Sequence, residues 1–119
     1  RDTDWKMDSP PWYGPRQNSF NGFAAYFEDV VREGEILTLE QAVHQVTEVA
    51  AKKFKITDRG VLKEGAYADV VVMDLERVKD MSTSLDPAVY PDGNDHVFIN
   101  GEQFVEGMKH NGAKPGKFL

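Results

Sequence analysis

The chain changes character at Gly60-Val-Leu-Lys-Glu-Gly-Ala-Tyr-Ala-Asp-Val-Val-Val-Met-Asp74. Residues 67–75 are rich in side chains that favour β-strands, and two glycines punctuate the approach to them. Because the apolar run is nearly continuous, we expect a strand that is covered on both faces. The residues before this stretch have helical spacing, and those after it read as strands and turns. The sequence therefore predicts an α+β fold.

Two helices are predicted on the N-terminal side. Residues 19–33 carry apolar side chains at helical spacing, and Gly34 suits the left-handed position that ends a helix. Residues 38–54 repeat the pattern and begin with a capping box of Thr38 and Gln41. The expected buried positions are Phe20, Phe23, Ala24, Phe27, Val30 and Val31 in the first helix, and Leu39, Ala42, Val43, Val46 and Ala50 in the second.

Strands and turns are predicted on the C-terminal side. Residues 80–95 read as a long loop, residues 96–100 and 102–106 as strands, and Asn100-Gly101 as a type I′ hairpin turn between them. We expect these strands to share one sheet with the strand at 67–75. So few strands cannot close a sheet, so we expect an open edge and a chain cut from a larger protein.

Composition excludes several classes of protein. The net charge of −6 argues against a nucleic-acid partner, because phosphate binding needs clustered Lys and Arg. No apolar run approaches the roughly 20 residues that span a bilayer, so no membrane association is expected. The chain has no Cys, which excludes disulfides and thiolate metal sites within it. These features are compatible with a cytoplasmic location, which we expect.

The stretch from Gly60 to Asp74 resembles the C-terminal signature of the amidohydrolase superfamily. Leu37-Thr-Leu-Glu-Gln-Ala-Val43 and His110-Asn-Gly-Ala-Lys-Pro-Gly116 resemble the N-acyl-D-amino-acid deacylases, or D-aminoacylases, in particular. Lys114 and Lys117 stand where that family usually has Arg. The resemblance implies that residues 1–55 are the last loop and helices of a TIM-like barrel. Residues 56–119 would then be the C-terminal part of a composite β-sandwich, and the earlier barrel and sandwich segments would be missing.

The resemblance also implies a function. Such enzymes use zinc to hydrolyse the linear amide bond of N-acyl amino acids, so the expected partner is a small-molecule substrate. The configuration of the amino acid stays open. Most of the family's metal ligands lie on earlier barrel strands, so we expect the isolated chain to be inactive.

Asp4 is the candidate catalytic residue and metal ligand that the resemblance implies. The family has an Asp in a Ser-Asp-Gly motif after the final barrel strand, and Thr3-Asp4-Trp5 stands in that place. Trp5 departs from the motif, and Asp2 and Asp8 are nearby competitors. A carboxylate at this position can take a proton from an attacking water and pass it to the leaving nitrogen.

Arg16 is the candidate substrate-binding residue. Its guanidinium could hold the free carboxylate of an N-acyl amino acid in a bidentate fork, and the alternative is a structural salt bridge to acids of the same loop. We interpret Asp69 and Asp74 as structural residues. The chain's three histidines, which we do not expect to be metal ligands, are His44, His96 and His110.

Two other functions remain open at this stage. Within the same superfamily, the chain could belong to a cyclic-amide hydrolase of the hydantoinase or dihydroorotase type. In a different class, it could be a non-catalytic β-rich module that binds a partner through its aromatic N-terminal loop. A coding sequence upstream of Arg1 that is long enough for a barrel and rich in His would favour an enzyme over a module.

Overall fold

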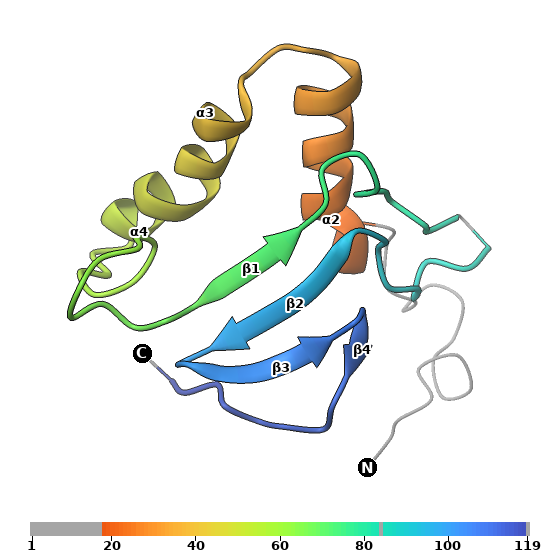
Figure 1. Cartoon of the computed structure of the whole chain (residues 1–119). Helices are drawn as coiled ribbons and strands as arrows, with labels where there is room; N and C mark the ends of the chain where they lie inside the picture. Colours follow the sequence, from red (N-terminus) through yellow and green to blue (C-terminus); the bar gives the residue numbers. More distant parts are fainter. Residues whose placement is uncertain (1–17, 84, 119) are drawn as a thin grey trace.

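A computed structural model describes residues 18–83 and 85–118. Within these ranges two helical arms come first and a four-stranded antiparallel sheet follows. In Figure 1 both arms lie next to β1, at one edge of the sheet, and β3 and β4 lie toward the opposite edge. This arrangement confirms the α+β class. The assignment of residues 1–55 to a barrel and of 56–119 to a sandwich stays a prediction.

The first arm consists of α2 (Asn18–Tyr26) and the π-helical segment η2 (Phe27–Glu33). It covers the predicted helix at 19–33. Ala24 and Phe27 are buried as expected, but Phe23 is 69% exposed, so the prediction for that side chain was wrong. The buried face of the first arm runs through Asn21, Ala24 and Phe27 at intervals of three residues, which turns Phe23 away from the core.

Gly34 ends the first arm in a different way from the one predicted. Its φ of −85° is right-handed, and the left-handed residue is the following Glu35, with φ of 48°. Glycine is nevertheless required at position 34, because an added Cβ would lie 2.3 Å from the carbonyl oxygen of Asp29. The sequence therefore marked the end of the helix correctly, and the reason is close packing against a π-turn.

The second arm runs through α3 (Leu39–His44), η3 (Gln45–Val49) and α4 (Ala50–Lys53). It confirms the predicted helix at 38–54. The capping box is present: the Gln41 N–H donates to Thr38 Oγ1 (3.3 Å), and the Thr38 N–H donates to Gln41 Oε1 (3.0 Å). These two bonds satisfy amide donors that have no partner within the helix itself.

The core lies where the two arms meet the end of β1. Its buried side chains are Ala24, Phe27, Ala42 and Val78, and it brings together the first arm, the second arm and the segment after β1. The partly buried side chains packed around it are Tyr26, Val31, Leu37, Leu39, Val43, Val46, Met73 and Leu75. Apolar burial at this place therefore packs both helical arms against the segment that follows β1.

The sheet has the strand order β1-β2-β3-β4. Its strands are β1 (Val70–Met73), β2 (Asn94–Ile99), β3 (Glu102–Glu106) and β4 (Lys109–His110). Asn100 and Gly101 have φ of 52° and 81°, as a type I′ turn requires, so the predicted hairpin is confirmed. The sequence did not predict β4, and β1 is shorter than the predicted 67–75.

The expectation that β1 is covered on both faces was wrong. Val71 is 56% exposed and Val72 is 47% exposed. The apolar core reaches only the C-terminal end of this strand, at Met73, so the middle of the strand has no apolar cover. Among the described residues, β2 is the one strand that pairs with β1, which confirms the open edge.

Candidate functional site

The two predicted site residues, Asp4 and Arg16, lie outside the described residues, as do the competitors Asp2 and Asp8. The roles proposed for them therefore stay predictions. What the structure describes is the framework that follows this segment, which begins with α2 at Asn18. Three polar clusters hold this framework together.

The first cluster joins the start of α2 to the loop between β1 and β2. Asn21 is fully buried, and its Nδ2 donates to the carbonyl oxygen of Val89 (2.8 Å). The N–H of Met81 donates to Asn21 Oδ1 (3.4 Å). A buried amide with both ends paired to backbone fixes the relative position of two segments, because breaking either bond leaves a polar group unsatisfied. The beginning of α2 is therefore held against residues 81–89.

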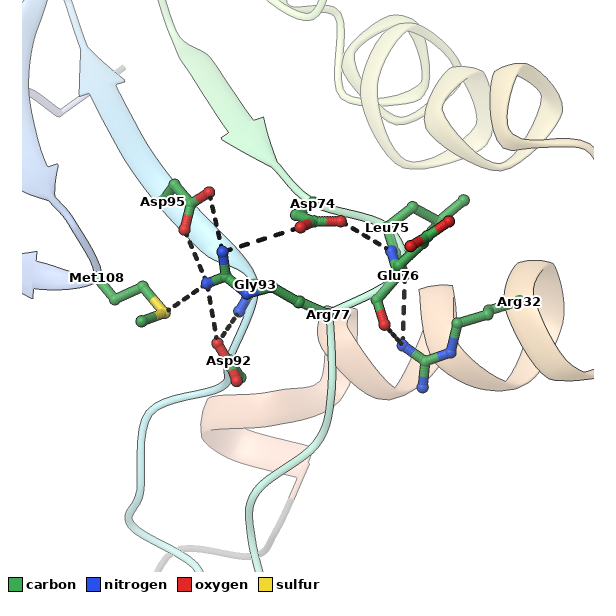
Figure 2. A network of polar contacts seen from close by, with 9 residues as sticks. All are labelled: Arg32, Asp74, Leu75, Glu76, Arg77, Asp92, Gly93, Asp95 and Met108. Carbon is green, nitrogen blue, oxygen red and sulfur yellow. Dashed lines mark hydrogen bonds and ion pairs between the residues drawn. The ribbon is translucent and has the colours of Figure 1, made fainter.

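Arg32 continues this contact at the other end of the arm. Its Nη1 donates to the carbonyl oxygens of Glu76 (3.2 Å) and Val78, and Figure 2 shows the guanidinium facing the turn after β1. Its Nη2 pairs with Glu28 Oε1 (2.8 Å), and Glu28 Oε2 accepts from the N–H of Asp80 (2.9 Å). The pair thus connects one face of the first arm to the backbone of residues 76–80.

Arg77 is the centre of a second cluster, shown in Figure 2. Its Nη2 lies 3.0 Å from Asp95 Oδ1 and 3.3 Å from Asp92 Oδ1, and its Nη1 lies 3.8 Å from Asp74 Oδ2. Hydrogen bonds to Asp95 and Asp92 raise the pKa of Arg77 above its usual value. Because all three carboxylates contact the guanidinium, this cluster joins the end of β1 to the start of β2.

Arg59 is the centre of a third cluster, which lies at the start of β1. It pairs with Asp69, donates through Nη2 to Asn100 Oδ1 (2.6 Å) and lies 4.2 Å from the centre of the Tyr67 ring. Asn100 in turn donates to Asp69 through its N–H (2.8 Å) and to the carbonyl oxygen of Pro115 through Nδ2 (2.5 Å). The cluster ties the turn before β1, the β2–β3 hairpin and the C-terminal tail together.

Sequence reasoning assigned Asp69 and Asp74 to structural roles, and their ion pairs confirm this. It missed Asn21, Arg32 and Arg77 as the residues that fix the framework. Apart from Glu28 beside Arg32 and Asp74 beside Arg77, their partners lie 15 to 68 residues away in the sequence, and no local pattern signals such pairs.

The histidines do not gather into a site. His44 is exposed and pairs with Glu48 (3.2 Å), while His96 Nδ1 lies 3.1 Å from Gln103 Nε2. Among residues 18–83 and 85–118, no group of three or more His, Asp or Glu side chains could hold a metal ion. Within the same ranges, no helix is long and apolar enough to cross a membrane.

Comparison with known proteins gives the class of this chain. Residues 3–105 match the amidohydrolase family. The match covers both helical arms, the 60–74 stretch and the hairpin, which are the features described above. The chain belongs to the amidohydrolase family.

Within this family the chain is similar to deacylases of D-amino acids. It is 33% identical over 105 residues to N-acyl-D-aspartate deacylase of Alcaligenes xylosoxydans xylosoxydans, covering 88% of this chain and 21% of that protein. It is 41% identical over 87 residues to N-acyl-D-glutamate deacylase of the same organism, covering 73% and 18%. The chain thus spans about a fifth of the length of these relatives.

A solved structure gives the same assignment. The chain superimposes on N-acyl-D-glutamate deacylase of Bordetella bronchiseptica with a TM-score of 0.73 and 38% identity, covering 75% of this chain and 19% of that one. That enzyme was crystallised with zinc and a phosphonate inhibitor that mimics the tetrahedral intermediate of the reaction. A similar D-aminoacylase has a binuclear metal centre.

Proposed function

We propose that this chain is part of a zinc-dependent amidohydrolase that hydrolyses the linear amide bond of N-acyl-D-amino acids. The observation that carries the proposal is its similarity, over 73–88% of the chain, to two deacylases of acidic D-amino acids. The substrate would be a small molecule with an acyl group on its amino nitrogen and a free carboxylate.

In this proposal the chain contributes framework and one catalytic residue. Residues 1–55 would supply the last loop and helices of a TIM-like barrel, and residues 56–119 the C-terminal strands of a composite β-sandwich. Because the chain spans about a fifth of its relatives, we propose that the 119 residues alone are inactive. The first polar cluster would hold the first helical arm against the segment after β1, and the other two would hold the strands, turns and tail together.

The described residues do not fit a zinc site, since no group of three potential ligands occurs among them. A zinc ion would supply Lewis-acid chemistry to the amide, and its ligands would come from outside the described ranges. Within this chain, Asp4 would be the remaining ligand and the base that takes the proton of the attacking water and passes it to the leaving nitrogen. Arg16 would pair with the carboxylate of the substrate.

A second candidate function comes from similarity to another enzyme of this type. Over 63 residues the chain is 33% identical to dihydroorotase of Lactobacillus helveticus, covering 53% of this chain and 15% of that protein. Dihydroorotase hydrolyses a cyclic amide, so substrates with the amide in a ring are the alternative. The shorter match makes this the weaker candidate.

The test is a substrate panel with the full-length protein that contains this chain. N-acetyl-D-glutamate, N-acetyl-D-aspartate, their L enantiomers and dihydroorotate would be compared by kcat/KM. We expect hydrolysis of a D substrate, and the 119-residue chain alone should release no product. Turnover of dihydroorotate without turnover of any N-acetyl amino acid would favour the alternative, and turnover of none of them would contradict the proposal.

A further inference from the structure

The chain contains three Asn-Gly pairs, at Asn21-Gly22, Asn100-Gly101 and Asn111-Gly112. An asparagine side chain can be attacked at Cγ by the peptide nitrogen of the next residue. Glycine in that next position permits the attack most readily, because it has no Cβ to obstruct the approach and adopts unusual backbone angles. The three sites share the Asn-Gly pair, but the structure places each pair in a different environment.

Asn111 lies at the end of β4, and its side chain is exposed. Its Oδ1 accepts a hydrogen bond from the N–H of Ala113 (2.9 Å), so the side chain folds back over the Gly112 peptide. A donor on this oxygen draws electrons from Cγ and stabilises the negative charge that develops when Cγ is attacked. The hydrogen bond from Ala113 therefore activates Cγ of Asn111, the atom that is attacked.

The nucleophile is also in contact with a base. The N–H of Gly112 donates to Nδ1 of His110 over 3.1 Å. The His110 ring packs edge-on against Phe104, with ring centres 4.2 Å apart, which holds its orientation. A neutral imidazole can take a proton from a bound donor and return it to a leaving group.

We propose that Asn111 is a site of self-catalysed deamidation, with His110 as the proton carrier. The nitrogen of Gly112 forms a bond to Cγ of Asn111 while its proton moves to His110 Nδ1. The bond from Cγ to Nδ2 then breaks, and the proton from the imidazole leaves with Nδ2 as ammonia. Water opens the resulting succinimide ring to aspartate or isoaspartate, so the net reaction consumes one water and releases one ammonia.

Asn100 is the matched internal comparison. Its Oδ1 is also polarised, by Arg59, but the N–H of Gly101 donates to the carbonyl oxygen of Ala68 (2.9 Å). A peptide carbonyl cannot take the proton, so the nucleophile stays inactive. Asn21 is fully buried in α2, where water cannot reach it to open a succinimide. The structure thus singles out Asn111 among the three pairs.

Deamidation would weaken the attachment of the tail. Asn111 Nδ2 now donates to the carbonyl oxygen of Gln103 (2.7 Å). An aspartate would place a charged acceptor against that carbonyl, and an isoaspartate would also lengthen the backbone beside β4. Both changes replace a hydrogen bond with a repulsive contact between two acceptors.

The experiment is an incubation of the purified chain at neutral pH and physiological temperature, followed by tryptic peptide mapping. The three pairs fall in separate tryptic peptides, 17–32, 80–109 and 110–117. Deamidation is read from the gain in mass when NH2 is replaced by OH, and isoaspartate from its separate chromatographic peak. We expect Asn111 to react at least about tenfold faster than Asn100 or Asn21, which is a modest effect for a positioned base.

Further measurements distinguish the effect of the folded geometry on the deamidation rate from the effect of the Asn-Gly pair itself. In concentrated urea the three rates should converge, because all three pairs have the same sequence. His110→Gln should slow the reaction at Asn111 by about tenfold, whereas Lys109→Gln on the same strand should leave it unchanged. His110→Asn serves the same purpose if circular dichroism shows that His110→Gln is unfolded. Equal rates at Asn111 and Asn100 in the folded chain, or no effect of replacing His110, would overturn the proposal.

Discussion

Asp69 joins two segments that are far apart in the sequence. It pairs with Arg59 ten residues earlier and accepts a hydrogen bond from the N–H of Asn100 thirty-one residues later. Its partial burial by itself would raise the pKa of the carboxyl group. The hydrogen bonds from Asn100 and Arg59 outweigh that effect and lower the pKa below its usual value.

This shift predicts how stability changes with pH. A carboxyl group whose pKa is lower in the folded state stabilises the fold above its unfolded pKa, which is about 3.9 for Asp. That stability is lost as pH falls through the folded value. We therefore expect the free energy of unfolding to fall below about pH 4, and Asp69→Asn to remove part of this decline while lowering stability at neutral pH.

Urea unfolding curves at a series of pH values would measure this effect. Thr57→Val, an uncharged change at a nearby exposed position, serves as the control and should keep the wild-type dependence on pH. If Asp69→Asn and the wild type lose stability in parallel below pH 4, the carboxylate does not carry the predicted linkage.

For single residues, the sequence predicted some roles but few of the residues that would be their hydrogen-bond or ion-pair partners. Asp69 and Asp74 were correctly read as structural because they flank a strand. The buried contact of Asn21 with Val89 could not be foreseen, because a polar residue on a helix gives no sign of which loop will cover it. Asp4 and Arg16 stay predictions that rest on family resemblance.

Among the helices and strands, the end of the first arm depends on Gly34, because a residue without a Cβ lets this arm end in a π-turn. Gly34→Ala would place a Cβ 2.3 Å from the Asp29 carbonyl oxygen. Relief of this overlap must shift backbone, so we expect the free energy of unfolding to fall by about 1–3 kcal/mol. Thermal and urea denaturation of the 119-residue chain would measure the change.

Gly116→Ala is the matched control, because an added Cβ there meets nothing within 4 Å. It should change stability by no more than about 0.5 kcal/mol, the usual range for a surface substitution. Equal stabilities of the Gly34 and Gly116 variants would show that the end of the first arm can relax without cost.

Patterns in adjacent residues predicted the helices and the hairpin well, whereas contacts between distant segments could not be predicted. The capping box at Thr38 and the turn at Asn100-Gly101 are encoded in a few adjacent residues, and both were confirmed. The segments η2 and η3 widen the helices without changing their apolar spacing enough to reveal it. The short β4 depends on pairing with β3, and its two residues carry no strand pattern of their own.

In the part of the chain that the structure describes, the sheet has an open edge at β1, and Val71 and Val72 are exposed on that strand. Unpaired strand edges with apolar side chains favour pairing with another chain. We therefore expect the 119-residue chain to self-associate, as measured by sedimentation velocity over a range of concentrations. Val71→Lys should reduce the association, because a lysine at an edge opposes pairing.

Lys53→Gln, on the last turn of the second arm, is the control and should leave the association unchanged. A chain that sediments as a monomer at all concentrations would show that the open edge does not promote self-association. In that case the exposed valines would give no support to the idea that other segments cover β1.

The central claim is that this chain is part of a deacylase and supplies one of its catalytic residues. The most direct test is kcat/KM for an N-acyl-D-amino acid, measured on the full-length protein with Asp4→Asn, Asp2→Asn and Asp8→Asn. Asparagine keeps the shape of aspartate but cannot accept a proton, so Asp4→Asn should lower kcat/KM by at least about 10²-fold with an unchanged melting temperature. The other two variants should retain most of the activity. If Asp4→Asn keeps near-normal turnover while Asp2→Asn or Asp8→Asn loses it, the catalytic residue has been misassigned; if none of the three matters, this chain provides framework alone.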